Sequence, residues 1–271
     1  DMINFYNHHN KFIFPLASKK KPCGETYNYY MRKWGCNLSI PFSSFHQYNR
    51  SDSLKMNEFV TPLKEHYNNF DFSKGELLPA YVIWDSLKED YKKINPHEKK
   101  PESIKPEHFG DNWSDVLDKR DKDILKEYFL KFDHIKEKFG FLNFNVGNKD
   151  FTIKLSNVKR GLEFTCPRNS LIFSIENNIF DDLLIGNFMK MKMINVNSLY
   201  PDFTPYVTKY GDNGLSSSKE ELKNYFNYYK INSANFWIDY LKLKTEDIIR
   251  PKLEEYKTLY FYARKIKRIL T

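Results

Sequence analysis

The stretch IPFSSFHQYNRSDS, residues 40–53, decides the architecture that this sequence predicts. Over residues 38–42 apolar side chains alternate with small or cyclic ones, which indicates a short strand that the proline and the following serines end. His46 would then lie on the loop at the exit of the strand, where sheets commonly carry ligands. Such a histidine is suited to bind a metal ion or to transfer a proton. The alternative is a surface residue that bonds to Asp52 or to a backbone carbonyl.

The composition indicates a folded chain of one large domain or two modest ones. With 271 residues the chain can bury a substantial core, and 17% aromatic residues argue against disorder. The net charge is +8, from 43 Lys and Arg against 35 Asp and Glu, but the basic residues are spread along the sequence. That distribution favours an acidic substrate or surface and is a weak indication of nucleic-acid binding.

The cysteine pattern and the hydropathy predict a cytoplasmic protein that does not enter the membrane. Cys23, Cys36 and Cys166 cannot all pair, and none belongs to a CxxC or CxH pattern, so neither a disulfide framework nor a cysteine-based metal cluster is expected. The sequence has no run of 18 apolar residues and no signal-peptide pattern. It begins at Asp1 rather than at methionine, as expected of a processed product, an engineered piece or the later part of a longer protein.

Three regions are predicted along the chain. Residues 1–95 carry the His46 loop. In residues 96–140 a linker rich in lysine, glutamate and proline leads into a helix over 121–139, whose apolar stripe is a packing face. Residues 141–271 form a C-terminal α+β and helical region.

Short strands and amphipathic helices are predicted in the C-terminal region. They comprise strands over 141–146, 151–155, 161–166 and 188–193, and helices over 170–185, from Ser218 onward and from Pro251 onward. The last strand places Met189, Met191 and Met193 on one face. A methionine face either packs in a core or adapts to a ligand. Aromatic residues crowd the final helices, where exposed Tyr and Trp would favour a docking surface and buried ones a core.

Two stretches together resemble one known family. Residues 40–53, followed by Asn57-Glu58, resemble the late strand and loop of metallo-β-lactamase-fold proteins of the CMP-N-acetylneuraminate hydroxylase type. Residues 169–200, which contain FDDLLIGNF at 180–188, look like the C-terminal region of the same group. The resemblance implies an α+β fold: the later part of a metallo-β-lactamase-like αββα sandwich, then a small α+β region and a helical C-terminal tail. The strand–helix–Gly–strand order has a weaker likeness to sterol-carrier-protein folds.

The same resemblance implies part of a metal site. In that superfamily an HxHxDH motif begins the site, and a later His, an Asp and a last His complete it. The likeness carries only His46 onto the last of these positions. Asp1 is the residue available to stand in for the bridging carboxylate, although nothing precedes it that could match the family. The sequence contains no HxHxDH motif and no Rieske cysteine–histidine pairs. A divalent metal (zinc, iron or manganese) would therefore need ligands from a missing N-terminal segment or a partner chain, because a reactive centre takes three or more protein ligands.

The function implied is that of a metal-dependent enzyme of the metallo-β-lactamase superfamily, a hydrolase or monooxygenase. Its substrate would be a small anionic molecule, linked to a sugar or a nucleotide, that Arg50, Asp52 and Asn57 bind. The alternative is a non-catalytic binding or interaction module that has lost, or never had, the metal site. Nucleic acid is not the expected partner, because no basic stripe interleaves with the aromatic residues in the sequence.

Overall fold

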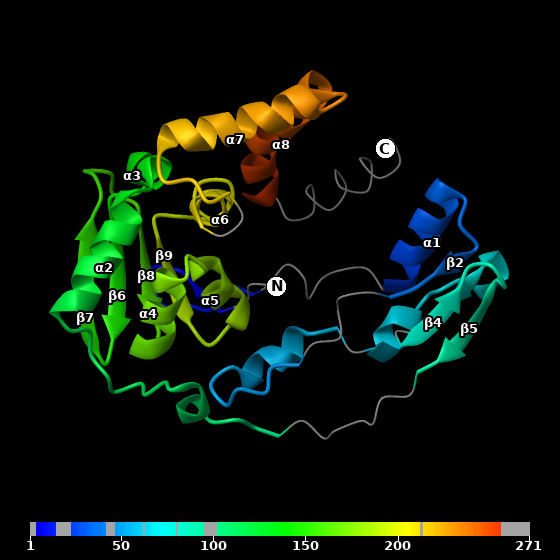
Figure 1. The fold of residues 1–271 in the computed structure, drawn as a ribbon, viewed down its shortest axis with the longest axis horizontal. Coiled ribbons are helices and arrows are strands. Elements are labelled where there is room, and N and C mark those ends of the chain that lie inside the picture. Colours follow the sequence, from blue (N-terminus) through cyan, green and yellow to red (C-terminus); the bar gives the residue numbers. More distant parts are fainter. Residues whose placement is uncertain are drawn as a thin grey trace.

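Strands and helices combine in an α+β fold, which a computed structural model describes over residues 4–14, 23–41, 47–61, 63–79, 81–94, 102–211 and 214–255 (Figure 1). The main sheet has five strands in the order β1-β9-β8-β6-β7. They are β1 (Phe5–Tyr6), β6 (Phe141–Val146), β7 (Lys149–Lys154), β8 (Gly161–Thr165) and β9 (Lys190–Ile194). The pairs β1·β9 and β6·β8 are parallel, whereas β8·β9 and β6·β7 are antiparallel. The α+β class predicted from the sequence is confirmed.

Helices make up most of the remaining C-terminal region. They are α2 (Lys119–Leu130), α3 (Asp133–Lys138), α4 (Arg168–Glu176), α5 (Phe180–Gly186), α6 (Thr204–Tyr210), α7 (Lys219–Asn232) and α8 (Phe236–Glu255). Contacts run from α2 to α4, from α4 to α5 and from α5 to α6. The buried side chains of these helices and of the sheet form one hydrophobic cluster. The C-terminal region therefore has a core of its own.

Period-two alternation explains the β6–β7 hairpin at one edge of this sheet. Leu142, Phe144 and Val146 of β6 are buried, and the residues between them are half-buried. The turn to β7 is Gly147-Asn148, with φ of 60° and 58°. Both values lie in the left-handed region, which two-residue hairpins require and which Gly and Asn adopt at least cost. The strands predicted over 141–146, 151–155 and 161–166 are thus confirmed within a residue or two.

Aromatic rings and methionines fill the core. Phe180 contacts Phe129 and Phe164 edge-to-face, with ring centroids 5.1 and 5.3 Å apart. Such geometry is the one that aromatic quadrupoles favour. The side chains of Met189, Met191 and Met193 are all buried, with less than 5% of each exposed. Of the two interpretations of the methionine face, the structure supports core packing.

The helix predicted over 121–139 is two helices in the structure. α2 ends at Leu130 and α3 begins after Phe132, so the continuous helix was wrong. The physical reason is that the Phe132 side chain is completely buried and stacks on Tyr210 at 4.9 Å. A tertiary contact of this kind outweighs the few tenths of a kcal/mol by which helix propensities differ.

Three further helix predictions have mixed outcomes. The helix expected over 170–185 divides into α4 and α5 near Asn178, whose φ of 57° is incompatible with a continuing helix. Pro251 does not begin a helix, because α8 runs through it. The start at Ser218 is confirmed: its hydroxyl accepts a hydrogen bond from the Glu221 N–H at 3.2 Å.

The N-terminal region is built from short elements with a smaller cluster of its own. Its elements are α1 (Cys23–Trp34), β2 (Leu38–Ser39), β3 (Glu76–Leu77), β4 (Val82–Asp85), β5 (Asp90–Lys93) and 3-10 turns at Leu54–Phe59, Leu63–Tyr67 and Phe72–Lys74. Met31, Phe70 and Leu77 are buried together. β2 covers the start of the strand predicted over 38–42, and Phe42 lies outside the described residues. The boundaries of the three predicted regions stay predictions.

His134 joins α3 to α6 and is held as the neutral ring. It stacks on Tyr206 with centroids 4.4 Å apart, and its Nδ1 lies 3.0 Å from the Tyr210 hydroxyl. Burial lowers the pKa of His134 below its ordinary value of 6.5, and the nearby Lys219 ammonium lowers it further. The pKa of His66, whose side chain is buried in the N-terminal region, is also lowered by burial.

We expect acidification to destabilise the fold through these two histidines. Below pH 6.5 the unfolded chain binds protons on both rings before the folded chain does, so the stability they contribute is complete above pH 6.5 and is lost as the pH falls. The midpoint of thermal unfolding should fall between pH 7.5 and pH 5.5. In His134→Gln this midpoint should decrease less over the same pH range. In His108→Gln, which alters an exposed ring, it should decrease as much as in the wild type. Equal slopes for all three proteins would contradict the assignment.

Candidate functional site

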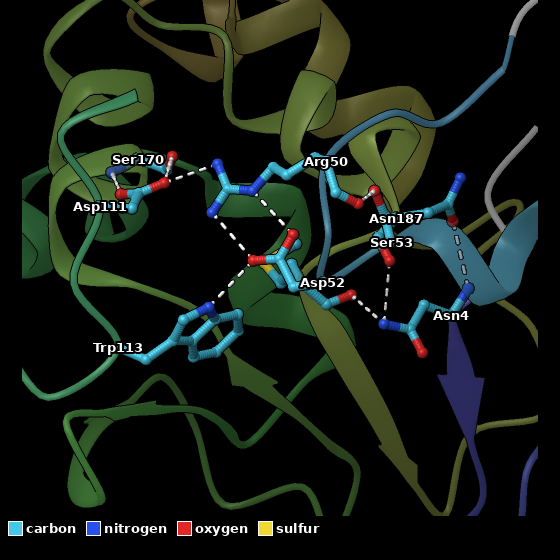
Figure 2. A network of polar contacts seen from close by, with 9 residues as sticks. Asn4, Arg50, Asp52, Ser53, Asp111, Trp113, Ser170 and Asn187 are labelled. Carbon is cyan, nitrogen blue, oxygen red and sulfur yellow. Dashed lines mark hydrogen bonds and ion pairs between the residues drawn. The ribbon is translucent and has the colours of Figure 1, made fainter. Parts of the chain in front are cut away.

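Two of the predicted substrate residues, Arg50 and Asp52, contact each other, Asn57 lies in a separate group of hydrogen bonds, and the predicted metal ligands are not described. Arg50, Asp52 and Asn57 all belong to the segment 47–61, which lies against the C-terminal region (Figure 2). His46 and Asp1 lie outside the described residues. The structure therefore brings Arg50 and Asp52 together, does not place Asn57 in contact with them, and leaves the metal-ligand assignment as a prediction.

Arg50 is the centre of this network. Its Nε and Nη2 donate to the two carboxylate oxygens of Asp52, at 2.8 and 3.1 Å. Its Nη1 lies 2.7 Å from Oδ2 of Asp111, which is sixty-one residues further along the chain. The guanidinium also lies over the Phe188 ring, 3.8 Å from the centroid. One side chain thus contacts two acids and the segment between α5 and β9.

Both carboxylates have further partners. Asp111 accepts hydrogen bonds from the Ser170 N–H at 2.8 Å and from the Ser170 hydroxyl at 2.5 Å, within the first turn of α4. Asp52 accepts from the indole N–H of Trp113 at 2.9 Å. The side chain of Asp111 is fully buried, and only 11% of the Arg50 side chain is exposed. The two acids are therefore charge-paired and hydrogen-bonded, as buried ions must be.

Main-chain pairing positions Arg50 in this network. Ile104 N–H donates to the Asn49 carbonyl at 2.8 Å, and Ser51 N–H donates to the Ile104 carbonyl at 2.9 Å. This isolated parallel bridge places residues 49–51 beside Ile104, from which the chain continues through a 3-10 turn (Pro106–Phe109) to Asp111. The Arg50 backbone is thus held on both sides of its Cα.

A second group of amides anchors the other end of the segment. Asn57 pairs with the backbone of Tyr48 through two hydrogen bonds of 2.8 Å. The Tyr48 hydroxyl accepts from the Asn187 amide at 2.6 Å, and Asn4 donates to the Asn187 carbonyl at 3.1 Å. Burial raises the pKa of the Tyr48 hydroxyl, which therefore stays protonated. Asn57 is thus a backbone-binding residue that fixes the Tyr48 loop.

The network joins segments of one chain that are distant in sequence. An incoming phosphate or carboxylate would have to displace Asp52 or Asp111 from Arg50, and bidentate arginine–carboxylate pairs are among the strongest charge-assisted hydrogen bonds. Substrate binding by Arg50, Asp52 and Asn57 stays a prediction. What the geometry supports is a clamp, which we call the Arg50 clamp: Arg50, Asp52, Asp111, Trp113 and Ser170.

Metal ligation finds no further support in the described residues. Over the ranges given above, no three His, Cys, Asp or Glu side chains are placed to hold one ion. Burial raises the pKa of the Cys166 thiol beyond its ordinary range, and the nearby Asp111 carboxylate raises it further, so the sulfur stays protonated. A protonated thiol is neither a metal ligand nor a nucleophile. The metal centre predicted with His46 and Asp1 is neither supported nor excluded.

A second candidate site is an exposed apolar surface on the last two described helices. We call it the helix-pair surface; its members are Phe226, Tyr228, Tyr229, Ile231, Trp237, Ile238, Tyr240, Leu241, Ile248 and Ile249. α7 is attached to the core through Leu222, which is buried, and Tyr225, which packs against the cluster. In Figure 1, α7 and α8 extend beyond the body that contains the main sheet. The sequence signal for this surface was the density of aromatic residues in the final third, which does not by itself distinguish core from surface.

Lysines lie over several rings of this surface. The Lys230 ammonium is 4.7 Å from the Trp237 ring, and that of Lys244 is 5.8 Å from the Tyr240 ring. Basic and aromatic side chains are therefore neighbours in the structure, although the sequence shows no continuous basic stripe. The expectation that nucleic acid is not the partner stays a prediction.

Comparisons with known proteins identify no relative. No family model matches the chain, and neither a curated protein nor a solved structure matches it at the level required of a relationship. Among the described residues, no helix combines the length and apolar character needed to cross a membrane. The function must therefore be argued from the Arg50 clamp and the helix-pair surface.

Proposed function

We propose that this chain is a non-catalytic interaction module that binds a protein partner through the helix-pair surface. One observation carries the proposal: the side chains of Trp237, Leu241 and Ile248 are each more than 60% exposed. Large apolar side chains that gather on one exposed surface mark sites of association in folded proteins. Trp and Tyr are also the residues that interfaces concentrate.

The stability of α8 supports the same proposal. After Phe236, every α8 side chain whose burial is described is exposed. Most helical stability in proteins comes from packing one face against a neighbour, and isolated helices are marginal in water. α8 receives little such packing from the described residues. A partner that covers it would provide the missing contacts.

The charge of the helix pair favours a protein over a lipid surface or a nucleic acid. Residues 219–255 contain seven Lys or Arg and seven Asp or Glu, so this part of the chain is neutral although the whole chain carries +8. Binding to anionic membranes or to phosphates requires an excess of basic residues. A neutral surface with both signs matches the mixed rim of protein interfaces.

We expect a photo-crosslinking residue at position 237 to capture a protein in cells that make the full chain. The adduct should be a discrete band that Leu241→Glu weakens strongly, because a buried glutamate opposes docking. Position 87 is the matched control: the Leu87 side chain is 95% exposed but lies on the turn between β4 and β5. No adduct at 237, or equal adducts at 237 and 87, would contradict the proposal.

The expectation of a metallo-β-lactamase-type enzyme stays a prediction beside this one. Its αββα sandwich, its substrate and its metal rest on the sequence resemblance alone. The measurement that separates the two functions is the zinc, iron and manganese content of the purified chain with and without His46→Ala. Stoichiometric metal that the variant loses would overturn the non-catalytic assignment.

A further inference from the structure

We infer that a second copy of this chain adds to the edge of the main sheet, with β7 antiparallel to β7 of that copy and Thr152 opposite Thr152. This edge is separate from the helix-pair surface, so the inference goes beyond the proposed function. Three features of β7 carry it: the open edge, the direction of the backbone groups and the order of the side chains.

β7 is the long open edge of the main sheet. In the part of the chain that the structure describes, it pairs with β6 on one side and with no strand on the other (Figure 1). The opposite edge strand, β1, has two residues and is bridged to Phe12. The side chains of Asp150, Thr152 and Lys154 are exposed. An open edge of six residues is a template for a further strand.

The hairpin fixes which backbone groups of β7 point outward. The residues that flank its two-residue turn, Val146 and Lys149, form a hydrogen-bonded pair, and such pairs alternate with non-bonded pairs along an antiparallel ladder. The end of the ladder agrees, because the Leu155 N–H donates to the Gly140 carbonyl at 2.8 Å. The N–H and C=O groups of the even-numbered residues in 150–154 therefore point away from β6. Among the described residues, none bonds to these groups.

The order of the side chains suits pairing with a second copy. With Thr152 at the two-fold axis, Asp150 lies opposite Lys154 of the second copy, and Phe151 lies opposite Ile153. Opposite charges, an aromatic beside a β-branched side chain, and paired threonines are the cross-strand neighbours that stabilise antiparallel sheets. A two-fold axis repeats every contact, so each of the first two pairs occurs twice. Both hydrogen bonds that Asp150 accepts use Oδ1, which leaves Oδ2 for the lysine.

Other registers of the same strand are unfavourable. A two-fold axis at Asp150 would place two carboxylates opposite each other, and an axis at Lys154 would do so with two ammonium groups. Axes at Phe151 or Ile153 would place Thr152 opposite a charge and leave that charge unpaired. Lysines on an edge strand usually discourage pairing, but Asp150 of the second copy neutralises Lys154 here. This self-complementary order selects a second copy as the added strand.

Sedimentation equilibrium of the full chain tests the inference. Between about 1 and 500 µM the wild type should change from monomer to dimer, the range of a weak and reversible interface. Thr152→Pro should raise Kd about tenfold or more, because proline removes the outward N–H at the axis. That N–H does not serve the β6–β7 ladder, and proline is tolerated at such edge positions. The near-ultraviolet circular dichroism of the variant should therefore match that of the wild type.

An exchange of charges tests the register. Asp150→Lys and Lys154→Asp should each raise Kd about tenfold, because like charges would then face each other on both sides of the axis. The chain that carries both changes has opposite charges again and should dimerise nearly as the wild type does. Lys149→Asp is the matched control: it changes the net charge as Lys154→Asp does but lies opposite Leu155, so Kd should stay unchanged. A double variant as weak as the single variants would overturn the register.

Two further outcomes overturn the inference. A wild type that stays monomeric at about 500 µM excludes self-association through β7, and any strand added there would come from another protein. A dimer that Leu241→Glu weakens and Thr152→Pro does not would locate self-association on the helix-pair surface instead. If the inference is correct, Leu241→Glu leaves Kd unchanged. The crosslink at position 237 tests the proposed function separately, so either proposal can fail while the other stands.

Discussion

Arg50→Ala is expected to lower the free energy of unfolding by about 3–5 kcal/mol, the loss measured when one member of a buried ion pair is removed. Asp111 would keep a fully buried carboxylate without its cation, and the Ser170 hydrogen bonds do not neutralise a charge. The contact between the guanidinium and the Phe188 ring would be lost as well. The result should be a folded but much less stable chain, measured by urea unfolding.

A matched variant, Arg120→Ala, shows how much of the loss in stability is due to the burial of the Arg50 ion pair and how much to the loss of any ion pair. Arg120 pairs with Glu176 at 3.0 Å, and both side chains are largely exposed. Arg120→Ala should therefore cost no more than about 1 kcal/mol. Arg50→Lys should lie between the two, because an ammonium keeps the charge but not the planar fork that holds Asp52. Equal losses for Arg50→Ala and Arg120→Ala would show that the Arg50 clamp does not stabilise the fold.

This experiment also bears on the substrate-binding role predicted for Arg50. A residue reserved for substrate usually contributes little to stability, or even reduces it, because its charge awaits a ligand. If Arg50→Ala unfolds at the same urea concentration as the wild type, the clamp is not a structural device and the substrate role gains support. A large loss assigns Arg50 to the attachment of segment 47–61 to the C-terminal region.

The strands could be predicted from the sequence because local pattern and burial agree there. In β6, alternation alone identifies the buried side chains, and the Gly147-Asn148 turn is recognisable from residue types. The break at Phe132 could not be predicted, because its cause is Tyr210, seventy-eight residues away. Periodicity describes neighbours along the chain and contains no information on that contact.

The candidate sites show the same division. That Arg50 and Asp52 would lie close together follows from their separation of two residues, and both were singled out for their chemistry. Asp111, the second acid that pairs with Arg50, could not be found in this way, since it is brought near by tertiary contacts such as the bridge between residues 49–51 and Ile104. For α8, the residue pattern is the same whether the apolar side chains are covered by this chain or by another protein. Sequence alone could therefore state the two alternatives for the aromatic tail but not choose between them.

Gly140→Ala is the second large effect that we expect, with a loss of about 3 kcal/mol, the upper end of the range for overfilled cores. A Cβ at Gly140 would lie 1.8 Å from the Val158 carbonyl oxygen, closer than any van der Waals contact. The backbone cannot move aside easily. Gly140 N–H donates to the Arg160 carbonyl at 2.8 Å, and its own carbonyl accepts from Leu155 N–H at 2.8 Å. The residue thus joins the start of β6 to the end of β7 and the start of β8.

Gly35→Ala provides the contrast in the same unfolding measurement. No atom lies within 4 Å of the Cβ that alanine would add there, but the φ of 65° is unfavourable for a side chain. Its cost should therefore be the conformational penalty alone, about 1 kcal/mol. Gly140 follows α3, so its alternative role is to end that helix. In that case Gly140→Ala and Gly35→Ala would both lose only this small free energy of unfolding. A markedly larger loss for Gly140→Ala would instead locate its importance in the close approach of residues 158–160 to the sheet.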